Sequence, residues 1–219
     1  FTSWKQPPSE SKIVVCGLKT DPQLEVKTKL YFLQITNEQS KGFMMNKCIF
    51  LDRDGVLNRE RGTYVYRLED FEVIENVAEA LKQLKEAGYL LVVVTNQSGI
   101  SKGLYTRDDV KKCHEYLQQH CDHLLDDLFM APYHPSISTS LSRKPDSWML
   151  EKAIGKYNID IAQSWLVGDS PTDIEAAKKI QVKTVQIESS FEHKPLSPLS
   201  DYTVKDLYEA AQLILSSSN

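Results

Sequence analysis

The feature that most limits the fold of this chain is a set of apolar runs that each end in a polar, glycine-containing loop. The three runs are Ile49–Leu51, Leu90–Val94 and Trp165–Val167. Apolar residues fill both faces of each run and helical patterns separate the runs, which predicts a parallel sheet covered by helices on both sides. Because the carboxyl ends of parallel strands meet at one edge of a sheet, we expect the three loops to converge there.

The segments between these runs complete the pattern of alternating strands and helices. Helices are predicted over residues 77–87, 106–121, 146–157, 171–180 and 204–215, and further strands within 124–130 and over 182–187. Residues 58–71 read as a loop that is too short for a separate cap domain. The chain is therefore expected to be an α/β protein with a three-layer sandwich and no large cap domain.

The first 45 residues do not follow this pattern. Two strand-like runs, Ile13–Val15 and Leu30–Leu33, flank a turn at Thr20–Pro22 and are compatible with a β-hairpin. Residues 37–42 read as a linker. We therefore expect an N-terminal extension over residues 1–45 and a catalytic domain over residues 46–219.

Composition excludes several classes of protein. The chain has 219 residues and a net charge of −4, so no basic field indicates a nucleic-acid partner. No apolar run is long enough to span a membrane, and no signal-peptide pattern opens the chain. The four cysteines form no Cys-x-x-Cys pair, which favours free thiols in a reducing compartment and a cytoplasmic location.

Asp52 and Asp54 carry the first chemical signal. They follow a buried-type strand, one residue apart, and Gly55 comes next. Strand alternation would point both carboxylates the same way, and two close like charges repel unless a cation or a shared proton lies between them. The pattern indicates a metal site, or a nucleophile with its proton carrier. A plain Asp/Gly turn is the alternative, and the spacing of Gly55 does not match a calcium-binding loop.

The segment Asp52-Arg53-Asp54-Gly55-Val56 resembles motif I of the haloacid dehalogenase-like (HAD) phosphohydrolases. The resemblance covers roughly residues 46–215 and implies a Rossmann-like sandwich around a parallel sheet, the HAD fold. It also implies that Asp52 attacks phosphorus to form an aspartyl-phosphate, and that Asp54 protonates the leaving group and later activates water.

Three further motifs of this family occur in order. Thr95 matches motif II, whose hydroxyl binds the transferring phosphoryl group, and the run from Val92 to Ile100 resembles a subgroup of heptose-bisphosphate and histidinol-phosphate phosphatases. The resemblance assigns substrate binding to Asn96, Gln97, Ser98 and Arg143. Taken without the resemblance, residues 95–99 read as an ordinary loop between a strand and a helix, and Arg143 as a solvated side chain.

Lys144 matches motif III, in which a lysine neutralises the phosphoryl oxygens, and the segment from Gly168 to Asp173 matches motif IV. The resemblance implies that Asp52, Asp54 and Asp169 bind Mg²⁺, and that Asp173 holds a metal-bound water or orients the loop. The structural alternative is a helix N-cap at Asp169 and Ser170, before Pro171, and both interpretations can hold together.

One departure from the subgroup concerns zinc. Many of its members bind a structural zinc between motifs II and III, but the four ligand positions here hold Ala131, Tyr133, Ser140 and Ser142. Zinc needs thiolates or imidazoles in tetrahedral number, so we expect none, and the loop over residues 135–142 should be held by packing alone.

These residues predict a Mg²⁺-dependent phosphomonoester hydrolase. By resemblance, the expected reaction removes the 7-phosphate of D-glycero-D-manno-heptose 1,7-bisphosphate, with histidinol phosphate or another small phosphate ester as the alternative. A non-catalytic phosphate-binding scaffold with the same fold is the alternative from another class, and a DNA 3′-phosphatase is disfavoured because no basic stripe stands out. The expected partner is a small phosphorylated metabolite, without nucleic acid or membrane, for a monomer or a weak homo-oligomer.

Overall fold

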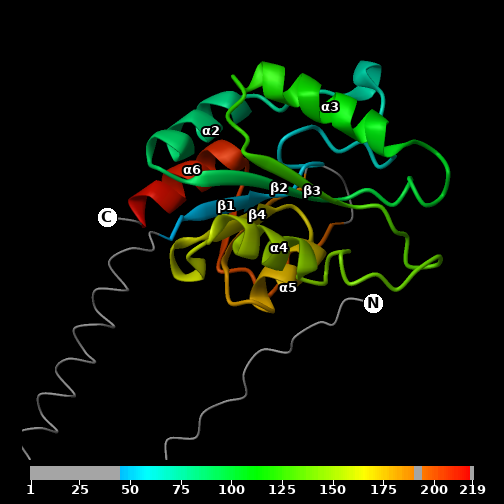
Figure 1. Cartoon of the computed structure of the whole chain (residues 1–219). Coiled ribbons are helices and arrows are strands. Elements are labelled where there is room, and N and C mark those ends of the chain that lie inside the picture. Colours follow the sequence, from blue (N-terminus) through cyan, green and yellow to red (C-terminus); the bar gives the residue numbers. More distant parts are fainter. Residues whose placement is uncertain (1–44, 190–193, 218–219) are drawn as a thin grey trace, which may run out of the picture. The chain divides into compact units, whose positions relative to one another are not determined.

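The structure, a computed structural model, describes residues 45–189 and 194–217, and six strands in this part of the chain form one parallel sheet. The strands are β1 (Cys48–Leu51), β2 (Leu90–Asn96), β3 (Asp127–Ala131), β4 (Trp165–Gly168), β5 (Lys183–Ile187) and β6 (Tyr202–Val204). Their order across the sheet is β3-β2-β1-β4-β5-β6. Figure 1 labels strands β1 to β4 of this sheet. The order reverses between β1 and β4, the point at which open α/β sheets bind their ligands.

Helices cover both faces of this sheet (Figure 1). They are α2 (Val77–Glu86), α3 (Arg107–His120), α4 (Trp148–Tyr157), α5 (Pro171–Lys178) and α6 (Leu207–Ser216), with short 3-10 turns η1 (Leu68–Asp70) and η2 (Ile161–Gln163). Strand β1 shows how the layers arise. Ile49 and Leu51 enter the core beneath α2, α3 and α6, whereas Cys48 and Phe50 enter the core beneath α4 and α5. Alternation along a strand that is apolar on both faces thus produces the predicted three-layer sandwich.

Most predicted elements lie within a few residues of their expected positions, with two exceptions. Strand β6 was not predicted, and the last helix begins at Leu207 instead of residue 204. Asp206 sets that start, because its carboxylate accepts a hydrogen bond of 2.8 Å from the backbone N–H of Glu209 and so caps the helix. Between β1 and α2 the chain forms only η1, so the absence of a large cap domain is confirmed.

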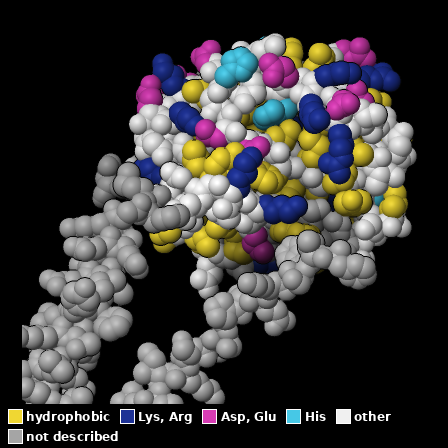
Figure 2. Space-filling model, in the orientation of Figure 1, with side chains coloured by type: hydrophobic (Ala, Val, Ile, Leu, Met, Phe, Trp, Pro, Cys, Tyr) yellow, Lys and Arg dark blue, Asp and Glu magenta, His cyan; other side chains and the backbone are white. Residues whose placement is uncertain are grey.

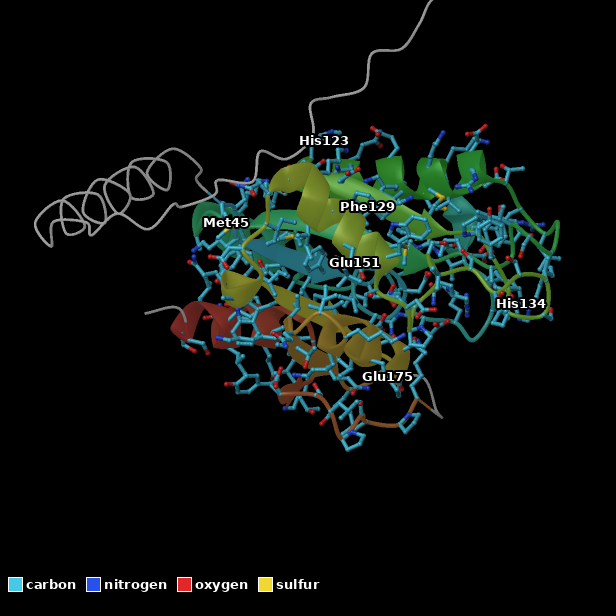
Figure 3. The ribbon with its side chains drawn as sticks, turned by 60° about the horizontal axis from the view of Figure 1, so that its bottom comes forward. Met45, His123, Phe129, His134, Glu151 and Glu175 are labelled. Atoms are coloured by element: carbon cyan, nitrogen blue, oxygen red, sulfur yellow. The ribbon has the colours of Figure 1, made fainter. Side chains whose placement is uncertain are left out.

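The two ends of the strands are well separated. Met45 lies directly before β1, whereas His134 lies in the loop after β3, at the opposite end of the sheet (Figure 3). The loops of interest follow the carboxyl ends of the strands, at the His134 end. The predicted N-terminal extension lies outside the described residues, so the division at residues 45 and 46 stays a prediction.

Basic and acidic side chains are interspersed on the face shown in Figure 2, without a continuous basic stripe. None of the helices in the described part of the chain combines the length and the apolar character needed to cross a bilayer.

Candidate active site

The three polar loops meet at one open cavity of about 750 Å³. Asp52 follows β1, Thr95 lies near the end of β2 and Asp169 follows β4, and all three side chains line the cavity. The loops come unusually close. A Cβ atom on Gly55, whose φ is +88°, would lie 2.0 Å from Oδ2 of Asp169. Only glycine allows both this left-handed backbone and this approach of the loop after β1 to the carboxylate after β4.

Asp52, Asp169 and Asp173 form a carboxylate cluster whose ligand oxygens all lie within 4.8 Å of one another. It is the one group of this kind, built from at least three His, Cys, Asp or Glu residues, in residues 45–189 and 194–217. The side chains of Asp169 and Asp173 are buried, and that of Asp52 is 13% exposed at the cavity. Three buried carboxylates of like charge require positive charge among them.

Lys144 supplies part of that charge. Its Nζ lies 2.8 Å from Oδ1 of Asp52 and 2.6 Å from Oδ1 of Asp173. It also donates a hydrogen bond of 2.7 Å to the carbonyl of Val94. Burial opposes the charge on this ammonium, but the carboxylates of Asp173 and Asp52 outweigh burial and raise the pKa of Lys144. The side chain is therefore a permanently charged lysine at the floor of the cavity.

The pKa values of the carboxylates stay raised although the ammonium groups of Lys144 and Lys194 oppose the shift. Burial, and then the neighbouring charge of Asp173, raise the pKa of Asp52 to about 7 although Lys144 opposes the shift. Burial likewise raises the pKa of Asp169 to about 6, against the effect of Lys194. Oδ1 of Asp169 is buried and has no hydrogen-bond partner in the described part of the chain. Hard carboxylate oxygens with an unused lone pair fit a divalent cation such as Mg²⁺.

Lys194 and Glu60 belong to the site although the sequence did not single them out. Nζ of Lys194 lies 2.5 Å from Oδ2 of Asp169 and 3.1 Å from Oε2 of Glu60, and both residues line the cavity. Lys194 comes from the segment after β5, so the rule that polar strand ends converge would have found it. Glu60 lies in the loop after β1 and carries no recognisable sequence signal.

Asp54 lines the same cavity, but its carboxylate is not one of the three that cluster, so its part in binding Mg²⁺ stays a prediction. Its carboxylate forms an ion pair with Arg53 and accepts hydrogen bonds from Asn58 and Gln97. The structure thus brings Asp173, in place of Asp54, beside Asp52 and Asp169.

The residues of motif II, Thr95 to Ser98, differ in their positions relative to the cavity. Thr95 lines the cavity, and its hydroxyl accepts a hydrogen bond of 3.0 Å from Gln97. Asn96 forms two hydrogen bonds with the backbone of Lys144, at 3.0 and 3.1 Å, so it positions this lysine. Ser98 is buried, and its hydroxyl oxygen lies 3.4 Å from that of Tyr64. Of the predicted substrate-binding residues, Asn96, Gln97 and Arg143 line the cavity.

Basic side chains gather at the rim of the cavity, around Tyr64. Lys102 donates a hydrogen bond of 2.9 Å to the Tyr64 hydroxyl, and the charges of Lys102 and Arg143 help to lower the pKa of Tyr64 against the effect of burial. Among the described residues, neither Lys102 nor Arg143 forms an ion pair with a carboxylate. The rim therefore carries uncompensated positive charge.

The loop that replaces the zinc-binding segment is held by more than packing, which corrects the sequence-based expectation. The backbone N–H of His134 donates a hydrogen bond of 2.9 Å to the hydroxyl of Ser101. The hydroxyls of Ser140 and Ser142 lie 2.8 Å apart, and Arg143 donates a hydrogen bond of 3.4 Å to the carbonyl of Tyr133. That the loop binds no zinc stays a prediction.

Comparisons with known proteins identify the family of this chain. A family model described as haloacid dehalogenase-like hydrolase matches residues 23–187. The D-glycero-beta-D-manno-heptose-1,7-bisphosphate 7-phosphatase of Haemophilus ducreyi is 42% identical over an aligned length of 150 residues, and the match covers 64% of this chain and 82% of that protein. The protein of the same name from Pasteurella multocida is 36% identical over an aligned length of 183 residues, and the match covers 78% of this chain and 97% of that protein.

A solved structure resembles the fold as well. The D,D-heptose 1,7-bisphosphate phosphatase of B. bronchiseptica, complexed with magnesium and phosphate, superposes with a TM-score of 0.72 at 26% identity. The match covers 78% of this chain and 99% of the other.

Proposed function

We propose a phosphatase function for this chain, because it belongs to the haloacid dehalogenase-like hydrolases. The observation that carries the proposal is the placement of Asp52 at the cavity, between the ammonium of Lys144 and the carboxylates of Asp169 and Asp173. A phosphate ester that enters this cavity meets a carboxylate nucleophile, a buried cation and a cluster suited to Mg²⁺. A scaffold protein that only bound phosphate would gain nothing from buried carboxylates, which repel an anion.

Mg²⁺ would be held by Asp52 and Asp169, with Asp173 in the same cluster. When bound, the ion neutralises charge on the phosphoryl oxygens. Lys144 contributes to the same charge stabilisation from the floor of the cavity, and it also holds Asp52 in place through Oδ1. The backbone N–H of Arg53 donates to that same oxygen at 2.8 Å, which leaves Oδ2 as the atom for attack on phosphorus.

The first step transfers the phosphoryl group to Asp52. An oxygen of Asp52 attacks phosphorus in line while the bond from phosphorus to the sugar oxygen breaks. Asp54, in its protonated form, gives its proton to the departing oxygen, so the sugar leaves as an alcohol. The Thr95 hydroxyl, at the end of β2, donates to a phosphoryl oxygen.

The second step releases phosphate. The Asp54 carboxylate, now without its proton, removes a proton from water as the water oxygen attacks phosphorus and the bond to Asp52 breaks. Inorganic phosphate leaves, and both aspartates return to their starting protonation states.

We propose the 7-phosphate of D-glycero-D-manno-heptose 1,7-bisphosphate as the group removed, as the names of the relatives suggest. A bisphosphate needs positive charge at two places. Lys144 lies at the floor of the cavity, and Arg143 and Lys102 provide uncompensated charge at its rim. Histidinol phosphate, the alternative substrate, carries a positively charged amine and fits such a rim poorly.

A panel of phosphate esters, assayed for phosphate release with Mg²⁺ and with EDTA, tests this proposal. We expect the heptose bisphosphate to be hydrolysed best, the heptose 7-monophosphate less well, and every reaction to stop in EDTA. Equal rates on all esters would refute the bisphosphate specificity, and release that is unaffected by EDTA would refute the metal requirement.

Arg143 allows a sharper version of the test. Because a hydrogen bond to a charged group contributes about 1.5–3 kcal/mol, Arg143→Met should raise KM for the bisphosphate by roughly tenfold to a hundredfold. KM for the heptose 7-monophosphate should change little. Arg67→Met is the matched control, because Arg67 is exposed and pairs with Glu69 at 3.3 Å without lining the cavity. Equal effects of Arg143→Met on both substrates would contradict the assignment.

The remaining assignments concern the whole chain. Residues 46–219 would form the catalytic domain and residues 1–45 an extension, with a monomer or a weak homo-oligomer in solution. The free thiols of Cys48, Cys113 and Cys121 support a reducing, cytoplasmic location. Sedimentation of the purified chain measures the oligomeric state, and metal analysis of the same sample tests for bound zinc.

A further inference from the structure

Arg53, the residue between the two aspartates, is a buried cation. It is the largest side chain by residue volume that is fully buried in the described part of the chain. A charge in such a position is costly unless it is paired and hydrogen-bonded. Its partner is Asp54, because Nη2 lies 2.8 Å from Oδ1 and 2.9 Å from Oδ2, and Nε lies 3.3 Å from Oδ1.

The guanidinium is itself fixed from the other side. Nη2 also donates a hydrogen bond of 2.7 Å to the carbonyl of Val65. The ring of Phe71 lies 5.5 Å from the guanidinium carbon, within the range of a cation–π interaction. Arg53 therefore cannot follow a movement of the Asp54 carboxylate without breaking contacts to the loop after β1.

Two amides complete the surroundings of Asp54. Asn58 donates a hydrogen bond of 2.9 Å to Oδ1, and Gln97 donates one of 3.1 Å to Oδ2. Gln97 is held in turn, since its Oε1 accepts a hydrogen bond of 2.8 Å from Tyr105. Donors from two different loops thus define the plane of one carboxylate.

We infer that Arg53 is a positioning residue that holds the Asp54 carboxylate in the orientation needed for both proton transfers. This inference rests on the proposed function, which gives Asp54 those transfers. In the first transfer a proton moves from Asp54 to the sugar oxygen as its bond to phosphorus breaks. In the second a proton moves from water to Asp54 as the water oxygen bonds to phosphorus and the bond to Asp52 breaks.

Arg53→Lys is the informative variant. Lysine keeps the charge, but its single ammonium cannot bind both oxygens of Asp54 and the Val65 carbonyl in the same geometry. A displacement of about 1 Å in a catalytic group can cost roughly a hundredfold in rate. We therefore expect the steps that need Asp54 to slow by about tenfold to a hundredfold, while Mg²⁺ binding and the attack of Asp52 remain.

The leaving group separates those steps. Nitrophenolate leaves p-nitrophenyl phosphate without needing a proton, so only hydrolysis of the aspartyl-phosphate requires Asp54. With this substrate, Arg53→Lys should release the first equivalent of nitrophenolate within about threefold of the unmodified rate and then turn over about tenfold to a hundredfold more slowly. With the heptose bisphosphate, whose alcohol needs a proton, the first step should slow as well.

Two controls separate positioning from a merely structural role. Arg59→Lys makes the same chemical change in the exposed ion pair of Arg59 with Glu72, at 2.8 Å. Leu84→Ala loosens the apolar core beneath α2 and leaves the residues that bind Arg53 and Asp54 unchanged. Thermal unfolding shows whether each variant is folded, and Asn58→Ala, which removes one donor to Asp54, replaces Arg53→Lys if the latter fails to fold.

A burst followed by slow turnover in Arg53→Lys or Asn58→Ala, and in neither control, supports the inference. The inference is overturned if folded Arg53→Lys turns over as fast as the Arg59→Lys control, or if Leu84→Ala gives the same burst. If the unmodified protein hydrolyses none of the esters, the proposed function is overturned, and the inference with it.

Discussion

Removal of the divalent cation is expected to make the stability of this protein fall as the pH rises from about 5 to about 8. The cause is the cluster of Asp52, Asp169 and Asp173. Burial and the charge of Asp173 raise the pKa of Asp52 to about 7, from an ordinary value of 3.8. Below the ordinary value the carboxyl is protonated in both the folded and the unfolded chain. Between the two values it is ionised only in the unfolded chain, so stability is lost progressively as the pH rises through this window.

The size of the loss follows from the same values. Each pKa unit corresponds to about 1.4 kcal/mol, and the window covers about two pH units above pH 5. Asp52 alone should therefore lower the free energy of unfolding by about 2–3 kcal/mol between pH 5 and pH 8. For a chain of this length that is a fall in Tm of roughly 5–10 °C. Asp169, whose pKa burial raises to about 6, adds to the effect in the same direction.

Thermal unfolding in EDTA and in Mg²⁺, at several pH values, measures how the carboxylate cluster affects stability. With the cation bound, the carboxylates are ionised throughout, so the increase in Tm caused by Mg²⁺ should be larger at pH 8 than at pH 5. Comparing Tm with and without Mg²⁺ at the same pH cancels the contribution of other titrating groups. In Asp52→Asn, the increase in Tm caused by Mg²⁺ should depend less on pH. An increase in Tm that is the same at both pH values would refute the reasoning about the cluster.

Three substitutions test the same site. Asp52→Asn should abolish turnover of every ester. The far-UV circular dichroism spectrum should be unchanged and Tm at least as high as in the unmodified protein, because one of three repelling charges is removed. Measurable turnover would refute the assignment of Asp52 as the nucleophile. Lys144→Met leaves Asp52 and Asp173 without their shared ammonium and should lower the free energy of unfolding, measured in urea, by about 3–5 kcal/mol. A decrease of less than about 1 kcal/mol would show that Lys144 is not coupled to the two carboxylates. Gly55→Ala places a methyl group against Asp169 on a backbone with positive φ, so it should lower the free energy of unfolding by at least about 2 kcal/mol. It should also weaken Mg²⁺ binding measured by calorimetry. Unchanged binding would show that the loops after β1 and β4 can separate.

The sequence predicted the convergence of the strand ends because that feature depends only on local patterns and on the parallel sheet. Asp52, Thr95 and Asp169 each follow an apolar strand, so the fold alone brings them together. Lys144 was different, since nothing in its own segment requires it to be buried. Its place depends on Asn96, which binds its backbone from another loop, and only the family resemblance pointed to it.

Two features of the loop after β1 could not be predicted from the sequence. Asp52 and Asp54 both line the cavity, but only Asp52 joins the carboxylate cluster, because Asp54 pairs with Arg53. Arg53 would be expected in solvent on composition alone, because a buried arginine is exceptional without a partner. Its burial depends on Val65 and Phe71, which are distant in sequence and carry no local signal.

The separation of the two aspartates explains how identical side chains, one residue apart, can carry different roles. Asp52 lies among carboxylates and one ammonium, so it is held ionised only when positive charge completes the cluster. Asp54 lies among a guanidinium and two amides, all of which are donors, so its surroundings are complete without a metal ion. Mg²⁺ should therefore control the nucleophile and leave the geometry of the proton carrier unchanged. A structure with Mg²⁺ that shows Asp54 still bound to Arg53 would agree, whereas its transfer to the ion would contradict this division of roles.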